Sequence, residues 1–203
     1  MNAKLSTENA TIQFKATLVT ISDWTILQVP EDESVKLSSR GQVSTDVTIR
    51  GHSFQIVLEP DGRWSHWCKV TPEMRATAGV KSGDTVTVVI TQRSDWPEPT
   101  VPDDFVVALA SAPDNVQAMW HDITPMARWE WIRWVNATRE QSTRDRRVKV
   151  SISKMNSGKR RPCCFNLAAC TDPDLSRSGR LMQPNDYCHD TGKSLLGSDY
   201  RLH

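Results

Sequence analysis

The stretch Asp95-Trp96-Pro97-Glu98-Pro99-Thr100-Val101-Pro102 divides the sequence into two parts of different character. Three of its eight residues are proline. Proline fixes the φ angle and lacks a backbone donor, so the stretch predicts an extended linker. Strand patterns precede it and helical patterns follow it. We therefore predict an α+β protein with a β-barrel domain at residues 10–94, the linker at 95–102, a helical module at 103–160 and an irregular tail at 161–203.

The part before the linker is typical of short antiparallel strands. Apolar and polar residues alternate over 11–18 and 43–50, which is the pattern of a strand with one buried face. A hairpin is predicted at Arg50-Gly51-His52 and a second turn at Pro60-Asp61-Gly62. Further strands are predicted at 64–70 and 84–93, separated by a short helix. Many short strands with frequent turns favour a closed or nearly closed barrel, or a sandwich.

The part after the linker predicts four helices. The first begins at Asp103, the second at Pro113-Asp114, and the third runs from Pro125 to about Gln141 behind the capping residue Thr124. The fourth is predicted to begin at Ser142, which forms a capping-box pattern with Asp145 three residues later. Its apolar residues Val148, Ile152 and Met155 recur at helical spacing.

Composition excludes several classes of protein. Hydrophobic residues make up 38% of the 203 and charged residues 24%, which is unlike a disordered chain, a collagen or a disulfide miniprotein. No apolar run approaches the roughly 20 residues of a membrane helix, and the N-terminus lacks the apolar core of a signal peptide. Five cysteines without an exported context predict reduced thiols in a cytoplasm. Eight tryptophans against two tyrosines and four phenylalanines are unusual.

Stretches on both sides of the linker resemble known families. Residues 71–75 with 79–88 resemble the helix, tight turn and strand of AbrB/MazE-like barrels. Residues 124–134 followed by 143–148 look like the YdeI/OmpD-associated family, also called bacteriocin-protection proteins, in which a small β-barrel domain of unknown function often precedes the helices. Residues 158–165 look like a tail of some members. Where the family leads us to expect a lysine after Ala137, this chain has Thr138, so no role of that lysine carries over.

The resemblance implies a double-split β-barrel joined to a helical module and an irregular tail, in a bacterial cytoplasmic protein. It implies no catalytic residues. The chain also lacks a phosphate-binding Gly-Lys-Ser/Thr loop, a His-Glu-x-x-His pair and a Gly-x-Ser-x-Gly elbow. Cys68 with His66 or His52 as its base would suit acyl chemistry. We favour a packed thiol beside an imidazole, because lone cysteines are commonly buried.

Two tryptophan clusters are candidates for ligand binding. On the predicted strand at 64–70, Trp64, His66 and Cys68 share one face and Trp67 takes the other. In the third helix, Trp131 and Trp134 share one face. Trp64, His66, Trp67, Trp131 and Trp134 could line an apolar pocket with a few polar groups. The alternative, which we favour, is that these rings fill the barrel and the space between the helices.

A basic run is the clearest electrostatic feature. Residues 128–161 hold eleven lysines and arginines against three acidic residues, whereas residues 1–100 hold ten against twelve. The run could bind phosphates, lipid headgroups or an acidic protein. Alternatively, its bases pair with acids of the barrel and hold the two parts together. The candidates for an anionic partner are Arg133, Arg144, Arg146, Arg147, Lys149 and Arg160.

The tail offers five soft ligands for a metal ion: Cys163, Cys164, Cys170, Cys188 and His189. Their spacing lacks the paired Cys-x-x-Cys pattern of a zinc site, so we predict no bound metal and no cofactor. The sequence as a whole predicts a non-catalytic binding module of the bacteriocin-protection type, acting as a monomer. Its partner is a small ligand, peptide or protein. A nucleic-acid-binding regulator and an enzyme using Trp64 to Cys68 are the alternatives.

Overall fold

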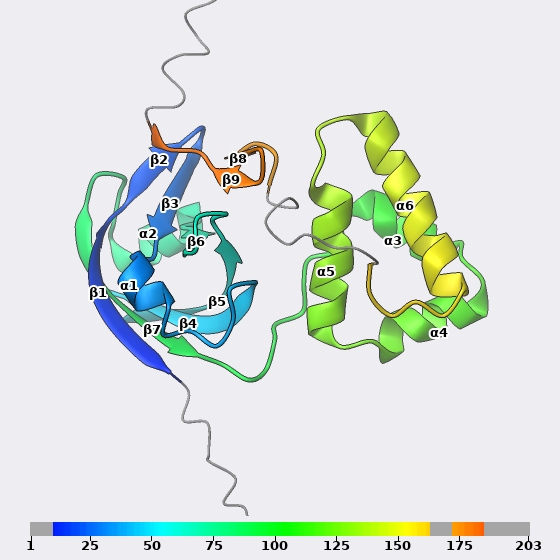
Figure 1. The fold of residues 1–203 in the computed structure, drawn as a ribbon, viewed down its shortest axis with the longest axis horizontal. Helices are drawn as coiled ribbons and strands as arrows, with labels where there is room; N and C mark the ends of the chain where they lie inside the picture. Colours follow the sequence, from blue (N-terminus) through cyan, green and yellow to red (C-terminus); the bar gives the residue numbers. More distant parts are fainter. Residues whose placement is uncertain (1–9, 163–171, 185–203) are drawn as a thin grey trace, which may run out of the picture.

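A computed structural model describes residues 10–162 and 172–184, and its first half is a curled antiparallel sheet (Figure 1). Neighbouring strands are hydrogen-bonded in the order β1-β7-β4-β5-β6-β3-β2. Two short helices lie among the strands. The elements are β1 (Thr11–Thr17), β2 (Val19–Ile21), β3 (Trp24–Gln28), α1 (Glu31–Ser34), β4 (Val43–Ile49), β5 (His52–Pro60), β6 (His66–Lys69), α2 (Pro72–Ala78) and β7 (Thr85–Gln92).

The sheet forms where the alternating residues predict it. Ile12 and Phe14 of β1 are buried in the core of the sheet, together with Ile49 of β4, while the residues between them in β1 are exposed. β4 and β5 are joined by the predicted tight turn, in which Arg50 and Gly51 have φ angles of 49° and 83°. Two consecutive residues with positive φ match the twist of an antiparallel hairpin.

The sheet curls because the segment from β1 to β2 and the strand β5 each contribute to both halves of it. The chain from β1 to β2 bends at the buried Leu18, so β1 pairs with β7 and β2 pairs with β3. Strand β5 pairs with β4 from His52 to Leu58, but with β6 only through Glu59 and Pro60. The result is a half-barrel that opens between β5 and β6. The predicted α+β class, with a curled strand domain ahead of helices, is confirmed.

The second half contains four helices around a separate apolar core. They are α3 (Asp103–Ala110), α4 (Asp114–Asp122), α5 (Pro125–Asn136) and α6 (Gln141–Asn156). The core includes Phe105, Val116, Trp131, Val135 and Met155. Thr124 caps α5 as predicted, because its hydroxyl accepts a hydrogen bond from the Ala127 N–H. No helix in the described parts of the chain is long and apolar enough to cross a bilayer.

Two boundaries of these helices differ from the prediction. α5 ends at Asn136 rather than near Gln141, because Ala137 leaves the helical conformation with a ψ angle of 40°. α6 begins at Gln141, and Ser142 lies in its first turn instead of capping it. The predicted capping box is therefore wrong. Asp145 accepts a hydrogen bond from the Gln141 side chain at 2.7 Å, which occupies the carboxylate that the capping box requires.

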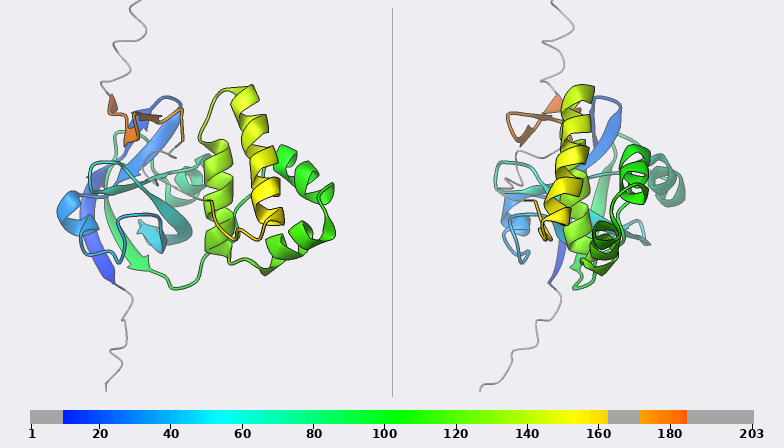
Figure 2. Two further views of the ribbon diagram at one scale, coloured as in Figure 1. Left: turned by 45° about the vertical axis from the view of Figure 1, so that its right-hand side comes forward. Right: turned by 90° about the vertical axis from the view of Figure 1, so that its right-hand side faces the viewer.

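Residues 172–184 form a structure that the sequence did not predict. Strands β8 (Ser176–Arg177) and β9 (Arg180–Leu181) make a small hairpin over β2, β3 and β6 (Figure 2). Leu175 and Leu181 are buried there against Trp67. Arg63 Nη1 donates to the Leu181 carbonyl at 2.6 Å. The predicted irregular tail is thus ordered in this stretch.

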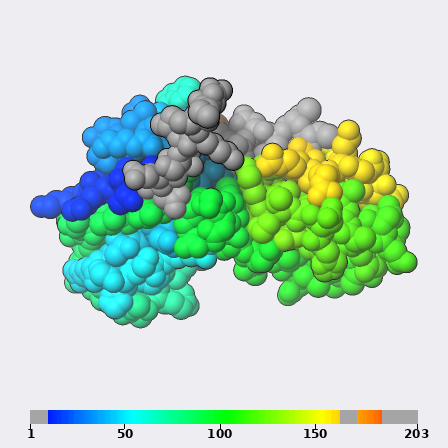
Figure 3. All heavy atoms as spheres, turned by 90° about the horizontal axis from the view of Figure 1, so that it is seen from below, coloured from blue at the N-terminus to red at the C-terminus, as the bar shows by residue number. Residues whose placement is uncertain are grey.

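The helices form a lobe beside the sheet, and α5 is the helix nearest to the strands (Figures 1 and 2). The space-filling view shows the two lobes side by side, with residues near 100 between them (Figure 3). This arrangement places one wall from each half of the chain around a single cleft.

Candidate functional site

A cleft of about 1040 Å³ lies between the sheet and the helices. Its sheet wall comes from β5, β6 and α2, and its helix wall from α5 and the residues just after it. The linker and residues 172–174 complete the lining. The apolar and aromatic part of the lining includes Phe54, Ile56, Trp67, Met74, Trp129 and Ile132. An apolar cavity with a few polar groups is the usual form of a binding site.

One buried ion pair joins the two walls of the cleft. Arg133 of α5 places its Nε 2.5 Å from Oε2 of Glu59 at the end of β5, and the two side chains are 6% and 19% exposed. Gln42 donates a hydrogen bond to Glu59 Oε1 at 2.7 Å. Burial raises the pKa of Glu59, and the Arg133 charge and the Gln42 hydrogen bond oppose that rise. Breaking a buried pair from one side costs about 3–5 kcal/mol, because the remaining charge stays buried without a partner, so loss of either side chain should favour separation of the two walls.

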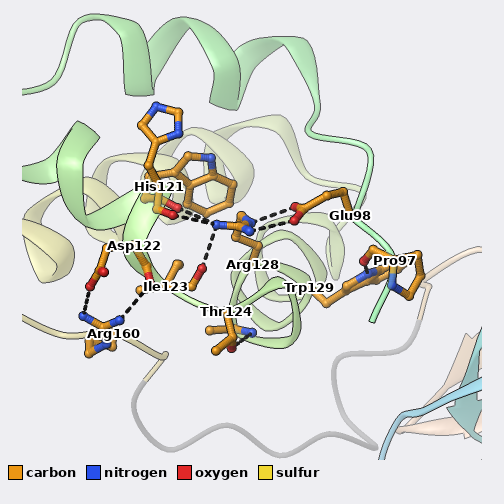
Figure 4. A network of polar contacts seen from close by, with 11 residues as sticks. Pro97, Glu98, His121, Asp122, Ile123, Thr124, Arg128, Trp129 and Arg160 are labelled. Atoms are coloured by element: carbon orange, nitrogen blue, oxygen red, sulfur yellow. Dashed lines mark hydrogen bonds and ion pairs between the residues drawn. The ribbon is translucent and has the colours of Figure 1, made fainter. Parts of the chain in front are cut away.

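A second network fixes the linker to α5 (Figure 4). Arg128 makes a two-point contact with the Glu98 carboxylate, at 2.8 and 2.7 Å. Its Nη1 also donates to the carbonyl oxygens of Trp120 and Ile123. Trp129 Nε1 donates to the Pro97 carbonyl at 2.8 Å. These contacts hold the linker along one helix, α5.

The predicted aromatic cluster on β6 is only partly formed. Trp64 lies before the strand with a φ angle of 74° and is 72% exposed, so it does not share a strand face with His66 and Cys68. This part of the prediction is wrong, because the turn after Pro60 extends through Trp64. Trp67 and Cys68 do take opposite faces: Trp67 packs against the β8–β9 hairpin and Cys68 against the core of the sheet. Both also line the cleft.

The helical tryptophans lie in the core of the helical lobe. Trp131 is fully buried and donates from Nε1 to the Arg160 carbonyl at 3.2 Å. Trp134 is half-buried and contacts Trp131 edge to face, with ring centroids 6.3 Å apart. Neither belongs to the cleft lining. The neighbouring Trp129 does line it, and this is the tryptophan of α5 that the sequence reasoning passed over.

Cys68 and His66 are separately buried and make different contacts. The Cys68 thiol is buried in an apolar environment, which raises its pKa to about 12. It is therefore protonated at neutral pH, whereas a cysteine nucleophile needs its thiolate. His66 has both ring nitrogens hydrogen-bonded, Nδ1 to Ser34 Oγ and Nε2 to the Gly41 carbonyl oxygen, each at 2.7 Å. His52 is exposed at the start of β5.

Most bases of the basic run are paired with acids. Within residues 10–162 and 172–184 six pairs are present, and in four of them the acid lies in the helical lobe or the linker. Among these six pairs, only that of Arg133 has its acid in the sheet. The interpretation that bases of the run hold the two parts together is therefore supported for Arg133 and not for the other five. The pairs are Arg128–Glu98, Arg133–Glu59, Arg139–Asp174, Arg144–Asp104, Arg160–Asp122 and Arg161–Glu130.

The remaining predicted anion contacts lie along α6. Arg147 donates to the Trp134 carbonyl at 2.7 Å, and its guanidinium lies over the Trp134 ring. Arg146 and Lys149 are exposed and form no ion pair within residues 10–162 and 172–184. Arg144 and Arg139 line the rim of the cleft, each beside its own carboxylate.

The candidate metal ligands Cys163, Cys164, Cys170, Cys188 and His189 lie outside the described residues. In the parts of the chain that are described, no group of three or more His, Cys, Asp or Glu side chains is placed to hold a metal ion.

Sequence reasoning missed Glu59 and Arg128. An acidic residue that ends an apolar strand directly before Pro60 is a signal that could have identified Glu59. For Arg128 there was no comparable signal, because its role depends on carbonyl oxygens that the end of α4 brings to it.

Two comparisons with protein families agree with this architecture. Residues 10–90 match the family described as a domain of unknown function, DUF1905, and residues 98–158 match the family described as bacteriocin-protection, YdeI or OmpD-associated. No curated protein matches the chain. The two matched ranges meet near the linker. The chain therefore carries a DUF1905 domain followed by a domain of the bacteriocin-protection, YdeI or OmpD-associated family.

Proposed function

We propose that this chain is a non-catalytic binding protein whose ligand occupies the cleft between the sheet and the helices. The observation that carries the proposal is the cleft itself, with a volume of about 1040 Å³ and an apolar, aromatic lining. Ligand sites typically measure about 300–1,000 Å³ and place a few polar groups among apolar ones. The name of the second family supports a role in resistance to bacteriocins.

The polar groups around the cleft favour binding over a reaction. Arg133, Arg139 and Arg144 each have a carboxylate partner. Cys68 is a protonated thiol at neutral pH, because burial raises its pKa to about 12. An apolar surface between paired charges binds a ligand by its shape and apolar area. We further propose that the protein acts as a monomer, since one chain supplies both walls, and in the cytoplasm, since it keeps an odd number of cysteines.

The test is the binding of anilinonaphthalene sulfonate, an amphipathic dye that fluoresces in apolar sites. The blocking variant is Gln55→Trp, because Gln55 is an exposed residue of β5 that lines the cleft. Its matched control is Gln13→Trp, an exposed position on β1 outside the cleft. We expect one saturable dye site per chain, weakened at least about tenfold by Gln55→Trp, which equals about 1.4 kcal/mol.

Gln13→Trp should leave the dye affinity unchanged. Equal affinity in the two variants would mean that the dye binds elsewhere and would overturn the proposal. So would the absence of saturable binding to the unaltered protein.

A further inference from the structure

Strand β5 has one edge that is paired and one that is not. Its first seven residues pair with β4, but its other edge meets β6 only at Glu59 and Pro60. The register would next place Leu58 opposite Cys68 and then Val57 opposite Lys69, but the pairing stops at Glu59 and Trp67. In the part of the chain that the structure describes, the edge from Ser53 to Val57 therefore has no neighbouring strand.

The hydrogen-bond pattern shows which residues face this open edge. Val57 lies opposite Ser44, and the Ser44 carbonyl accepts from the Arg93 N–H on the far side of β4, at 2.9 Å. Residues of an antiparallel ladder alternate between its two edges, so the backbone groups of Val57 point away from β4. By the same alternation, the backbone groups of Ser53 and Gln55 also point away from β4. The tight turn at Arg50-Gly51 leads to the same assignment. A two-residue turn is closed by a hydrogen-bonded pair, here Ile49 and His52, so every second residue after His52 points toward β4 and the residues between them point away.

These backbone groups face no paired strand within residues 10–162 and 172–184. Outside the strand ladders, no backbone hydrogen bond in those ranges involves Ser53, Gln55 or Val57, and the alternation of the β4–β5 ladder directs their N–H and C=O groups away from β4. Backbone donors and acceptors near apolar surface are costly to leave unpaired. Gln55, Val57 and Lys69 all line the cleft, so the unpaired edge opens into it.

The cleft also offers surface on both faces of a strand placed beside β5. On the inner face lie Ile56, Cys68 and Met74, which pack with the core of the sheet. Trp129 and Ile132 of α5 line the helix wall of the same cleft. A strand presents alternate side chains to opposite faces, so each face can receive every second residue of a peptide.

We propose that the ligand of the cleft is an extended peptide that adds to the open edge of β5 as a further strand. This rests on the proposed function, since it names the occupant of the same cleft. Unpaired N–H and C=O groups at alternate residues match the backbone of another extended chain, and few small molecules carry that repeat. The span from Ser53 to Val57 is about 13 Å, so about five residues of the peptide pair with it. Both faces favour apolar side chains.

The test begins with a displayed library of random seven-residue peptides. Peptides are selected on the unaltered protein after removal of those that bind Gln55→Trp. A selected peptide is then synthesised with N-methyl groups on alternate amides, in two complementary sets. Strand addition uses the amides of one set only. We expect one set to weaken binding at least about tenfold and the other to leave it within about threefold, since N-methylation removes the donors of the hydrogen bonds to β5 in one set only.

Amide hydrogen exchange tests strand addition independently, because it measures the hydrogen bonding of the β5 amides themselves. In the unbound protein the amides of Gln55 and Val57 should exchange faster than those of Phe54 and Ile56, which are bonded to β4. The bound peptide should slow exchange at Gln55 and Val57 at least about tenfold and leave Phe54 and Ile56 unchanged.

The outcomes separate this inference from the proposed function. If peptides displace the dye but both N-methyl sets bind equally and Gln55 and Val57 remain unprotected, strand addition is overturned and the cleft stands as a binding site. If the library yields no peptide while the dye binds as expected, the peptide is the wrong occupant. If neither dye nor peptide distinguishes Gln55→Trp from the unaltered protein, both proposals fail.

Discussion

His66 is a neutral imidazole held between two buried partners. The Gly41 carbonyl can only accept a hydrogen bond, so His66 Nε2 carries the proton and Nδ1 accepts from the Ser34 hydroxyl. Burial lowers the pKa of His66, chiefly because the charged ring loses solvation, although the Gly41 hydrogen bond opposes the shift. The residue thus joins α1 and the segment before β4 to β6.

This environment predicts a loss of stability in mild acid. The unfolded chain takes up a proton at His66 as the pH falls through about 6.5, whereas the folded chain does so only at lower pH. The free energy of unfolding should therefore fall below about pH 6.5, with a His66 contribution of at most about 1.4 kcal/mol per pH unit. Chemical denaturation of the unaltered protein and His66→Gln between pH 7 and pH 5 measures the difference in slope.

His121→Gln is the matched control, because His121 is exposed on α4. It should keep the slope of the unaltered protein. A His66→Gln profile as steep as that of the unaltered protein would contradict the assignment.

The residues of the site were predictable only where local pattern decides their surroundings. Trp67 and Cys68 follow strand alternation, and they take opposite faces as predicted. Trp64 could not be placed in this way, since the left-handed conformation at its backbone belongs to the turn rather than to the strand. Glu59 and Arg133 are 74 positions apart in the chain. Their contact depends on how the two lobes pack, which no local pattern encodes.

Among the elements, the β8–β9 hairpin depends on the close approach of two glycines. Gly62 has a φ angle of 73°, and a Cβ at this position would collide with the Gly179 carbonyl oxygen. The Asp61 carbonyl beside it accepts from the Leu181 N–H at 2.9 Å. The hairpin can reach Trp67 only because position 62 has no side chain.

Gly62→Ala should therefore release the hairpin from the sheet. Gly83→Ala is the control, because Gly83 also has positive φ but open space around it. Both variants carry backbone strain of about 1–2 kcal/mol, and only Gly62→Ala adds the collision. Trypsin cleavage after the exposed Arg177 and Arg180, followed by mass spectrometry, should be several times faster in Gly62→Ala than in Gly83→Ala. Equal cleavage rates would show that the approach at Gly62 does not hold the hairpin.

The same hairpin explains why some strands escaped prediction. In β3 the consecutive residues Thr25, Ile26 and Leu27 are all buried. Leu27 faces the core of the sheet, and Ile26 faces the β8–β9 hairpin. A strand covered on both faces loses the alternation of a half-buried strand. Strand β1 has one exposed face, and its alternation is clear in the sequence.

At the scale of the whole molecule, ion pairing leaves few bases of the run available to bind an anion. Six of its eleven bases pair with carboxylates, and Arg147 is directed to the Trp134 carbonyl. The other four are Arg146, Lys149, Lys154 and Lys159. Five of the six carboxylates lie outside residues 128–161 and one, Glu130, lies within the run, so acids from elsewhere in the fold neutralise much of its positive charge.

Binding to duplex DNA should accordingly be weak. At most four phosphate contacts give a slope of log affinity against log salt concentration no steeper than about −4. Fluorescence anisotropy with a labelled random duplex, repeated over a range of salt concentrations, measures both affinity and slope. We expect no sub-micromolar affinity at physiological salt. A slope well beyond −4 together with sub-micromolar affinity would instead favour a nucleic-acid-binding regulator.

The fastening of the linker to α5 has a consequence for the thermodynamics of binding. Glu98 and Pro97 are tied to Arg128 and Trp129 on the helix side. On the sheet side Arg93 bonds to both Asp46 and Asp95, and the Glu59–Arg133 pair spans the cleft, so contacts hold the linker to both lobes. The cleft therefore keeps its width before a ligand arrives. A ligand gives up its own translational and conformational entropy on binding, but the protein has little disorder to lose. The entropy lost on binding therefore comes mainly from the ligand. A ligand that is already rigid or extended loses less entropy and should bind more tightly.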